Sequence, residues 1–336
     1  MASVSAFLTF ALCLLPFALT GSSIEVLSPT NALPAHLATQ LREPAGYMVL
    51  ANGDAIIYDR GAQSIYKVDA AKGTMRKIVD VGTSGGELFN PIVFTPGPAG
   101  MFATVDLPFG RERVQLFVDT GKIFGGFGFP STTVKTTTMI DLGIGRVDAL
   151  QFTGQTILAS LPASGSLFTE FGRDGHALRQ IGTLRPTGVE SRAGLHAALN
   201  RGIALADPKG GFYFVFETGL PMFRKYDAAG TLIYERHIEG AELDRVVQGL
   251  PTVWPPDLPN GAFPFVPKTI ETAAVDPAGR LWISLKDPFT YVYDTAGDKI
   301  RTVQFTATGP LTATSFFFAS ATRLLVTPGC YEFAVR

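Results

Sequence analysis

Short apolar runs alternate with tight turns along most of the chain, and this pattern predicts β-strands. After about residue 23, apolar side chains rarely recur at the three- and four-residue spacing of an amphipathic helix. They gather instead in short runs rich in Val, Ile, Phe and Tyr, separated by Gly, Pro and Asp. The first group favours strands and the second favours turns. The pattern therefore predicts an all-β protein.

The clearest unit covers residues 274–297, with the sequence AVDPAGRLWISLKDPFTYVYDTAG. It contains three expected strands, and a fourth follows at residues 299–305. Pro277 presets φ at one tight turn, and Gly279 and Gly297 supply the positive φ that such turns need. This unit predicts a four-stranded antiparallel sheet.

The same order of strands and turns recurs in four other segments: residues 46–73, 93–121, 148–175 and 202–230. The first tight turn of each unit contains a glycine: Gly53, Gly100, Gly154, Gly211 and Gly279. Successive glycines in this series are about 47, 54, 57 and 68 residues apart. A period of this size with four strands per unit is the signature of a β-propeller.

The last unit, residues 314–336, offers only three strands. The segment SIEVLS at residues 23–28 is expected to supply the fourth and to close the ring. Such closure removes the open edges that a linear array of sheets would expose. We therefore predict a six-bladed β-propeller whose last blade is closed by an N-terminal strand.

These units resemble NHL-type repeats and the wider group of six-bladed propellers that includes the regucalcin-like gluconolactonases. The resemblance covers roughly residues 23–336 and is strongest at 203–230 and 274–297. It implies an architecture and is nearly silent on function. Regucalcin-like enzymes hold a divalent metal in the channel with Glu, Asn and Asp, and Asp148, Asn200 and Glu271 are residues of these types. No matching motif stands at the first channel strand, so the resemblance assigns no ligand, and a single Ca²⁺ or Zn²⁺ ion has no motif to support it.

The first residues read as a signal peptide. Residues 6–19 are apolar except for Thr9, a run that suits a signal-peptide core and is too short to cross a bilayer. The preceding residues carry no Lys or Arg, which weakens the signal. We expect a signal peptide at residues 1–22, one domain at residues 23–336, and a secreted or periplasmic protein. No later run reaches 18 apolar residues, so no membrane span is predicted.

Composition excludes several classes of function. The chain has 336 residues with 46% hydrophobic and 17% charged residues, too apolar to be disordered. A net charge of −1 gives no basic excess for nucleic-acid binding. Two cysteines cannot build a disulfide framework, and the four histidines show no metal-binding spacing. No GxSxG motif is present, so catalytic residues stay unknown.

Strand parity predicts which end of the propeller carries function. In antiparallel blades, the connections between strands two and three and those between blades lie on one face. The long segments 124–146, 185–201 and 239–268 all fall in these positions. Long loops on a rigid scaffold commonly form binding sites. Trp254 lies in the proline-rich part of the last segment, as a binding platform or lid, or as a hydrophobic cover over the channel.

Two sets of polar residues are candidates on this face. Acids at the end of strand two form an expected rim: Asp59, Asp106, Glu217 and Asp287. They suit a cation or a polyol, or else bind the backbone of their own turns. Polar residues near the starts of the channel strands form the second set: Arg146, Asp148, Asn200, Arg201, Lys268 and Glu271. These bind a ligand or pair with one another across the channel.

Because no complete catalytic constellation is visible, we predict a monomeric binding platform. Its loop-rich face would take a protein, peptide or carbohydrate ligand. The alternative is a metal-dependent lactonase or hydrolase of regucalcin type, with its site at the channel mouth. A lyase or carbohydrate-active site on the acidic rim is a third hypothesis.

Overall fold

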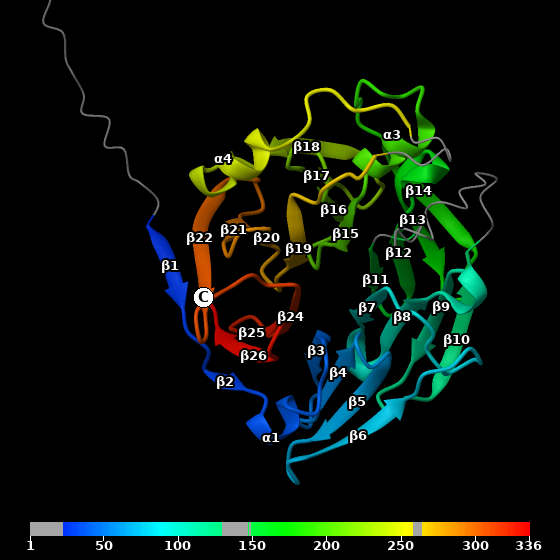
Figure 1. Cartoon of the computed structure of the whole chain (residues 1–336), viewed down its shortest axis with the longest axis vertical. Helices are drawn as coiled ribbons and strands as arrows, with labels where there is room; N and C mark the ends of the chain where they lie inside the picture. The colour runs from blue at the N-terminus through cyan, green and yellow to red at the C-terminus, as the bar shows by residue number, and fades with distance from the viewer. Residues whose placement is uncertain (1–22, 130–146, 148, 258–263) are drawn as a thin grey trace, which may run out of the picture.

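Six blades, each built on four antiparallel strands, surround a central channel (Figure 1), and the sheet of one blade is extended to six strands. The computed structural model describes residues 23–129, 147, 149–257 and 264–336. The first strands of neighbouring sheets contact one another and form the wall of the channel. This arrangement confirms the prediction of a six-bladed β-propeller.

The first three blades follow one another along the chain. Blade 1 contains β3 (Pro44–Val49), β4 (Ala55–Asp59), β5 (Ser64–Asp69) and β6 (Thr74–Val79). Blade 2 contains β7 (Val93–Pro96), β8 (Phe102–Asp106), β9 (Arg113–Phe117) and β10 (Ile123–Gly128). Blade 3 contains β11 (Leu150–Phe152), β12 (Thr156–Ser160), β13 (Ser166–Gly172) and β14 (Ala177–Thr183).

The last three blades complete the ring. Blade 4 contains β15 (Gly202–Ala206), β16 (Phe212–Phe216), β17 (Met222–Tyr226) and β18 (Leu232–His237). Blade 5 contains β19 (Ile270–Val275), β20 (Leu281–Leu285), β21 (Thr290–Tyr293) and β22 (Lys299–Thr306), with the short β23 (Pro310–Leu311) paired to β22. Blade 6 contains β24 (Ser315–Ser320), β25 (Arg323–Thr327), β26 (Tyr331–Ala334) and β2 (Asn31–Ala32).

Short helices lie in the connections. They are α1 (Ala35–Ala38), α3 (Ala193–Leu199), α4 (Ala241–Gln248), η1 (Pro98–Gly100), η2 (Pro108–Gly110) and η3 (Pro162–Ser164). In the part of the chain that the structure describes, no helix is long and apolar enough to span a membrane.

The ring is closed by a different N-terminal strand from the one predicted. The fourth strand of blade 6 is β2, which pairs with β26, and not residues 23–28. β1 (Ile24–Leu27) instead adds in parallel to β22, the outer strand of blade 5. There Glu25 forms an ion pair with Arg301 at 3.3 Å, and Leu27 packs into the apolar cluster between blades 5 and 6. These two contacts favour blade 5 over blade 6 for this segment.

Apolar clusters between neighbouring blades form the core. Among the described residues there are six such clusters, one for each pair of adjacent blades. Aromatic side chains fill much of this space; Phe102 and Phe117, for example, stack with ring centroids 5.1 Å apart. The 26 Phe of the sequence suit this design, because each ring buries a large apolar area between two flat sheets.

The parity argument placed the long connections correctly. The described parts of 185–201 and 239–268 lie on one face with α3 and α4, and this loop-rich face is toward the viewer in Figure 1. The predicted loop 124–146 was too long, because residues 124–128 belong to β10. The sequence IFGGFG hid this strand, since glycine weakens a strand pattern. Residues 130–146 lie outside the described part of the chain.

Candidate binding face and channel mouth

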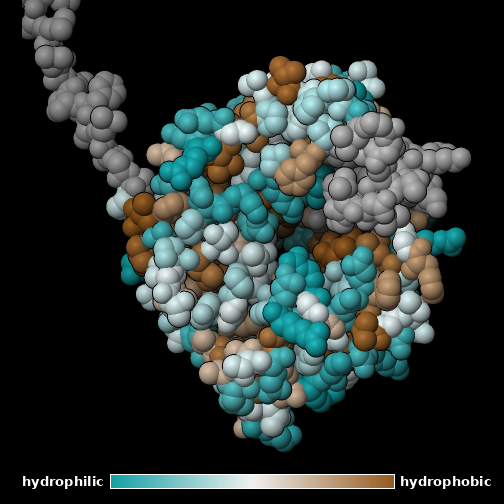
Figure 2. Space-filling view, viewed as in Figure 1, coloured by the Kyte–Doolittle hydropathy of each residue, from teal (hydrophilic) through white to brown (hydrophobic). Residues whose placement is uncertain are grey.

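The central channel contains a cavity of about 1440 Å³. Residues of the first strand of every blade line it, among them Tyr47, Phe94, Gln151, Ala204 and Phe316. Figure 2 shows the loop-rich face with a hollow near its middle and both hydrophilic and hydrophobic side chains around it. A cavity of this size exceeds what most small ligands need.

Three ion pairs lie at the mouth of the channel: one between blades 4 and 5, one in blade 5 and one in blade 1. Lys268 Nζ donates to Glu217 Oε1 at 2.8 Å. Lys286 pairs with Glu271, and Arg60 pairs with Glu43. In each pair the cation is the more exposed partner. Lys268 and Glu271 are therefore paired, but each with a partner outside the predicted channel set, and not with one another across the channel.

Blade 6 adds hydroxyl groups to the mouth. Thr327 Oγ1 lies 3.0 Å from Thr314 Oγ1 and 2.6 Å from Ser315 Oγ. Thr314 and Ser315 line the cavity. The mouth is thus polar along four adjacent blades, 4, 5, 6 and 1.

Two acids of the predicted rim are wholly buried and hold loops. Asp59 accepts backbone N–H groups of Arg42, Glu43 and Ala62 at 2.7, 2.8 and 3.1 Å. It therefore ties the segment entering blade 1 to the end of β4. This matches the interpretation that the acids bind backbone, although most of that backbone lies in the preceding segment instead of the acid's own turn.

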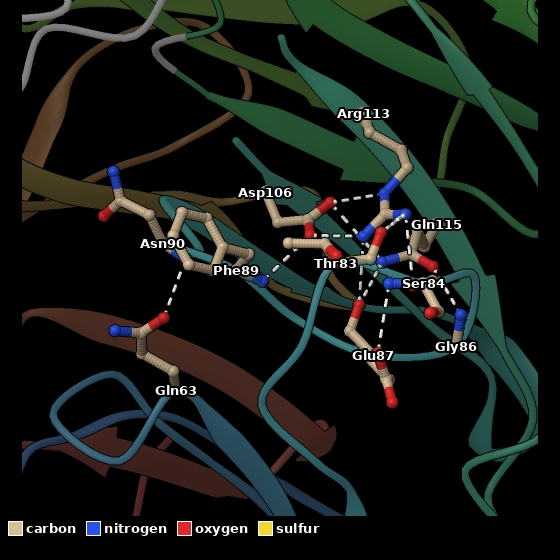
Figure 3. A network of polar contacts seen from close by, with 10 residues as sticks. All are labelled: Gln63, Thr83, Ser84, Gly86, Glu87, Phe89, Asn90, Asp106, Arg113 and Gln115. Atoms are coloured by element: carbon tan, nitrogen blue, oxygen red, sulfur yellow. Dashed lines mark hydrogen bonds and ion pairs between the residues drawn. The ribbon is translucent and has the colours of Figure 1, made fainter. Parts of the chain in front are cut away.

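Asp106 anchors a larger network at the entry to blade 2 (Figure 3). It accepts the Phe89 N–H at 3.0 Å and two hydrogen bonds from Arg113, at 3.0 and 2.7 Å. Arg113 also donates to the carbonyls of Thr83, Ser84 and Glu87, so one guanidinium shapes the whole glycine-rich turn. Charge-assisted bonds of this kind fix loop geometry strongly.

The other two rim acids differ from this pattern. Glu217 is buried, with Oε1 bound to Lys268, while Oε2 has no hydrogen-bond partner among the described residues. Its side chain also lines the channel cavity. Asp287 is half-buried, and its carbonyl accepts the Phe289 N–H at 2.7 Å. The structure therefore does not bring the four acids together as one ring of equivalent ligands.

Asn200 is committed to the backbone of its own loop. Its Oδ1 accepts the Arg185 N–H at 2.8 Å, and its Nδ2 donates to the carbonyls of Arg185 and His196. The Arg185 guanidinium in turn donates to the carbonyls of Leu199, Thr218 and Leu220. Burial, with the nearby Arg224, lowers the pKa of Arg185 to about 10.

Of the three remaining mouth candidates, the structure describes only Arg201. The carbonyl of Arg201 accepts the Glu217 N–H at 2.9 Å, which fixes the start of β15. Arg146 and Asp148 lie outside the described residues.

The regucalcin-type metal site does not fit these side chains. The amide of Asn200 is occupied, and Glu271 is paired with Lys286. In the described ranges, no group of three His, Cys, Asp or Glu side chains is placed to hold a metal ion.

Trp254 anchors its loop to α3. It is half-buried against the cluster of Leu195, Ala198, Leu199 and Val266. Arg192 reinforces this contact by donating to the Pro255 carbonyl at 2.7 Å. Trp254 is therefore a packing residue of the loop-rich face and not a freely exposed platform.

The two faces of the propeller differ in the exposed apolar side chains of their connections. All described large apolar residues that are exposed in connections belong to the loop-rich face: Val81, Phe89, Phe109, Leu220, Val253 and Phe265. The others lie in strands β1, β10, β14, β18 and β22. Phe109 is 84% exposed at the tip of η2 with φ of 54°, and Phe265 is 76% exposed.

Sequence reasoning missed several of these residues. Phe109 follows the Leu-Pro pair that ends β8, and its exposure depends on a left-handed turn that the sequence does not mark. Arg60 and Glu43 come from different connections of blade 1, and the antiparallel pairing of β3 with β4 places them side by side. Arg113 carries one signal that was available: it begins the third strand of blade 2, seven residues after the acid that ends the second strand.

The ring of six blades, with its channel opening on a loop-rich face, defines the protein as a six-bladed β-propeller. Among solved structures, a streptogramin B lyase is similar at a TM-score of 0.51 and 12% identity, covering 85% of this chain and 76% of that one. A Bacteroides thetaiotaomicron protein of unknown function is similar at 0.52 and 13%, covering 88% and 70%. A Staphylococcus aureus virginiamycin B lyase gives 0.49 and 10%, covering 88% and 85%.

At these identities the similarity shows the fold alone. No protein-family model matches the sequence, and no curated protein matches it.

Proposed function

We propose that this protein is a binding propeller whose loop-rich face takes a polypeptide partner with an apolar surface. The observation that carries this proposal is the distribution of exposed apolar side chains. Those that lie in connections all belong to one face, whereas the described turns of the opposite face carry none. Apolar groups in water-exposed loops are a cost to a free monomer and a gain in an interface.

The rest of the face is suited to such a role. Trp254, Asn200 and Arg113 hold three separate loops in fixed positions, which lowers the entropy lost on binding. We further infer a secreted or periplasmic location from the apolar segment at residues 6–19, and NHL-type repeats from the turn pattern at 203–230 and 274–297.

Selection of dodecapeptides from a random library on the purified protein tests the proposal. We expect the dominant binders to lose about tenfold in affinity for Phe109→Ser or Phe265→Ser, because each change removes an exposed ring from the interface. Leu178→Ser is the control, since Leu178 is 53% exposed on the outer strand β14. Isothermal titration gives the affinities.

Two results would overturn the proposal. One is a set of selected peptides that bind the loop-face variants and the control equally well. The other is binding to a glycan array, lost in the same variants, from a protein that selects no peptide.

The alternative is a metal-dependent lactonase or hydrolase at the channel mouth. The chain shares its six-bladed architecture with a streptogramin B lyase, a similarity that shows the fold and carries no activity to this chain. The paired state of Glu271 and the occupied amide of Asn200 count against it.

A further inference from the structure

A second hollow on the loop-rich face lies between α4 and the connection from β16 to β17. It has a volume of about 360 Å³ and is lined by residues of this connection, of the end of β18 and of α4. We call it the α4 groove. Its lining includes no residue of the channel cavity. It is therefore a separate candidate site.

The floor of the α4 groove is apolar. Pro221, Ile238 and Leu243 are buried there, and Val247 is half-buried. Leu220 stands at the edge with 56% of its surface exposed. The volume suits one or two aliphatic side chains, at the lower limit of small-molecule pockets.

Leu220 is unusual among the Leu-Pro pairs of this chain. Blades 2, 3 and 4 each have such a pair in the connection from the second to the third strand. Leu107 is buried and Leu161 is half-buried. In blade 4 the pair comes later in the connection, and its leucine faces outward beside an apolar hollow. An exposed aliphatic side chain in that position is poised to contact a second apolar side chain.

The charges that the α4 groove presents are acidic. Glu239 and Asp244 are exposed in its lining, and neither forms an ion pair among the described residues. The lining contains no Lys or Arg; His237 is its other titratable residue. Glu242, also on α4, accepts from the Tyr291 hydroxyl at 2.5 Å.

Two cations lie close to the groove and are engaged elsewhere. Arg185 is buried and donates to the Leu220 carbonyl at 2.7 Å, and Lys299 Nζ donates to the Glu239 carbonyl at 3.0 Å. Both bind backbone oxygens. Arg245 follows Asp244 on α4 and is exposed, but it lies outside the lining of the groove. Among the described residues, none of these three cations forms an ion pair with Glu239 or Asp244. The exposed charge above the apolar floor is therefore negative.

We propose that the α4 groove binds a polypeptide segment in which aliphatic residues are flanked by Lys or Arg. The aliphatic side chains enter the hollow between Leu220 and Val247. The flanking cations approach Glu239 and Asp244 at its edges. This assignment rests on the proposed function of the loop-rich face and adds the chemistry of the partner segment.

Two fluorescein-labelled octapeptides test the assignment. One has Leu-Val between Arg and Lys, and the other has Glu at both flanking positions. Fluorescence anisotropy with the full-length protein is expected to give at least about tenfold tighter binding for the cationic peptide, with an affinity that falls as salt rises. Asp244→Asn is expected to weaken that peptide about threefold, and Leu220→Ser about fivefold.

Matched controls are available on other surfaces. Asp298→Asn changes an exposed acid on the opposite face, and Leu178→Ser changes a leucine of similar exposure on β14. Neither is expected to change the anisotropy curve. Equal binding of the two octapeptides, or unchanged binding to Asp244→Asn and Leu220→Ser, would overturn the assignment.

The test also separates this inference from the proposed function. Library-selected peptides that depend on Phe109 but bind Asp244→Asn and Leu220→Ser normally would support the loop-rich face and overturn the α4 groove. Selected peptides that depend neither on Phe109 nor on Asp244 and Leu220 would overturn both the proposed function and the assignment of the α4 groove.

Discussion

Asn200 is buried in the loop before β15, and both polar atoms of its side chain bind backbone groups of that loop. Asp59, Asp106 and Arg113 act in the same way at blades 1 and 2. Each of these residues converts an irregular segment into a defined shape, because a buried polar group must find a partner. The buried polar residues thus fix the shape of the loop-rich face, and they are not themselves available to bind a ligand.

Asn200→Asp distinguishes this structural role from a metal-ligand role. Aspartate would replace the Nδ2 donor by an oxygen that faces the carbonyls of Arg185 and His196. We expect the free energy of unfolding to fall by about 2 kcal/mol or more, measured by urea denaturation.

Asn90→Asp is the control, because Asn90 is exposed and its side chain has no hydrogen bond among the described residues, whereas its backbone N–H donates to Gln63. Unchanged stability of Asn200→Asp, or a gain in stability when Ca²⁺ is added, would contradict the structural role.

At the scale of elements, two N-terminal strands join different blades. β1 extends blade 5, and β2 pairs with β26 in blade 6. The Thr30 N–H also donates to the Glu332 carbonyl at 2.7 Å, and the Leu33 N–H to the Cys330 carbonyl at 3.1 Å. Closure of the ring therefore depends on residues 30–33, while β1 covers an edge outside it.

Shortened chains test this division. A protein that begins at residue 28 lacks β1 but keeps β2, and we expect it to stay monomeric with a modest decrease in Tm. A protein that begins at residue 33 leaves β26 as an open edge, and we expect it to associate or aggregate. Light scattering after size-exclusion chromatography and thermal melting measure both effects. Monomeric behaviour of the shorter protein would show that β2 is dispensable.

Turn chemistry predicted the elements well, and the pairing of short strands was less predictable. The Asp-Pro-Ala-Gly and Asp-Thr-Ala-Gly turns of blade 5 mark their strands, because proline and glycine restrict the backbone locally. Asn31 and Ala32 carry no such signal, since a two-residue strand is defined by its partner. The mouth pairs, such as Lys268 with Glu217, also join residues far apart in sequence, so only the assembled ring reveals them.

At the scale of the whole molecule, interblade packing forms a channel, and the described acids at its mouth are already paired with cations. Glu217, Glu271 and Glu43 each have a cationic partner. A ligand at this mouth must compete with those pairs, whereas the exposed apolar residues of the loops have no such competitor. Binding is therefore expected to favour the loops over the channel interior.

Metal removal tests this view of the mouth. We expect a chelator to change the Tm by less than about 1 °C, because a ligand stabilises only a protein that binds it. Metal content of the purified protein and melting curves with and without added Ca²⁺ or Zn²⁺ provide the measurement. A clear decrease in Tm on chelation, reversed by one of these ions, would favour the lactonase alternative.

The strand that closes the ring also constrains the order of folding. The hydrogen bond from Thr30 to Glu332 joins residues 302 positions apart in the sequence. During synthesis the first five blades can form as they emerge, but β2 has no partner until the ribosome has passed Glu332. Contacts of such long range slow the final step. Until then, the incomplete ring exposes the apolar side of blades 1 and 5, which makes late synthesis the stage most open to aggregation or to capture by a chaperone.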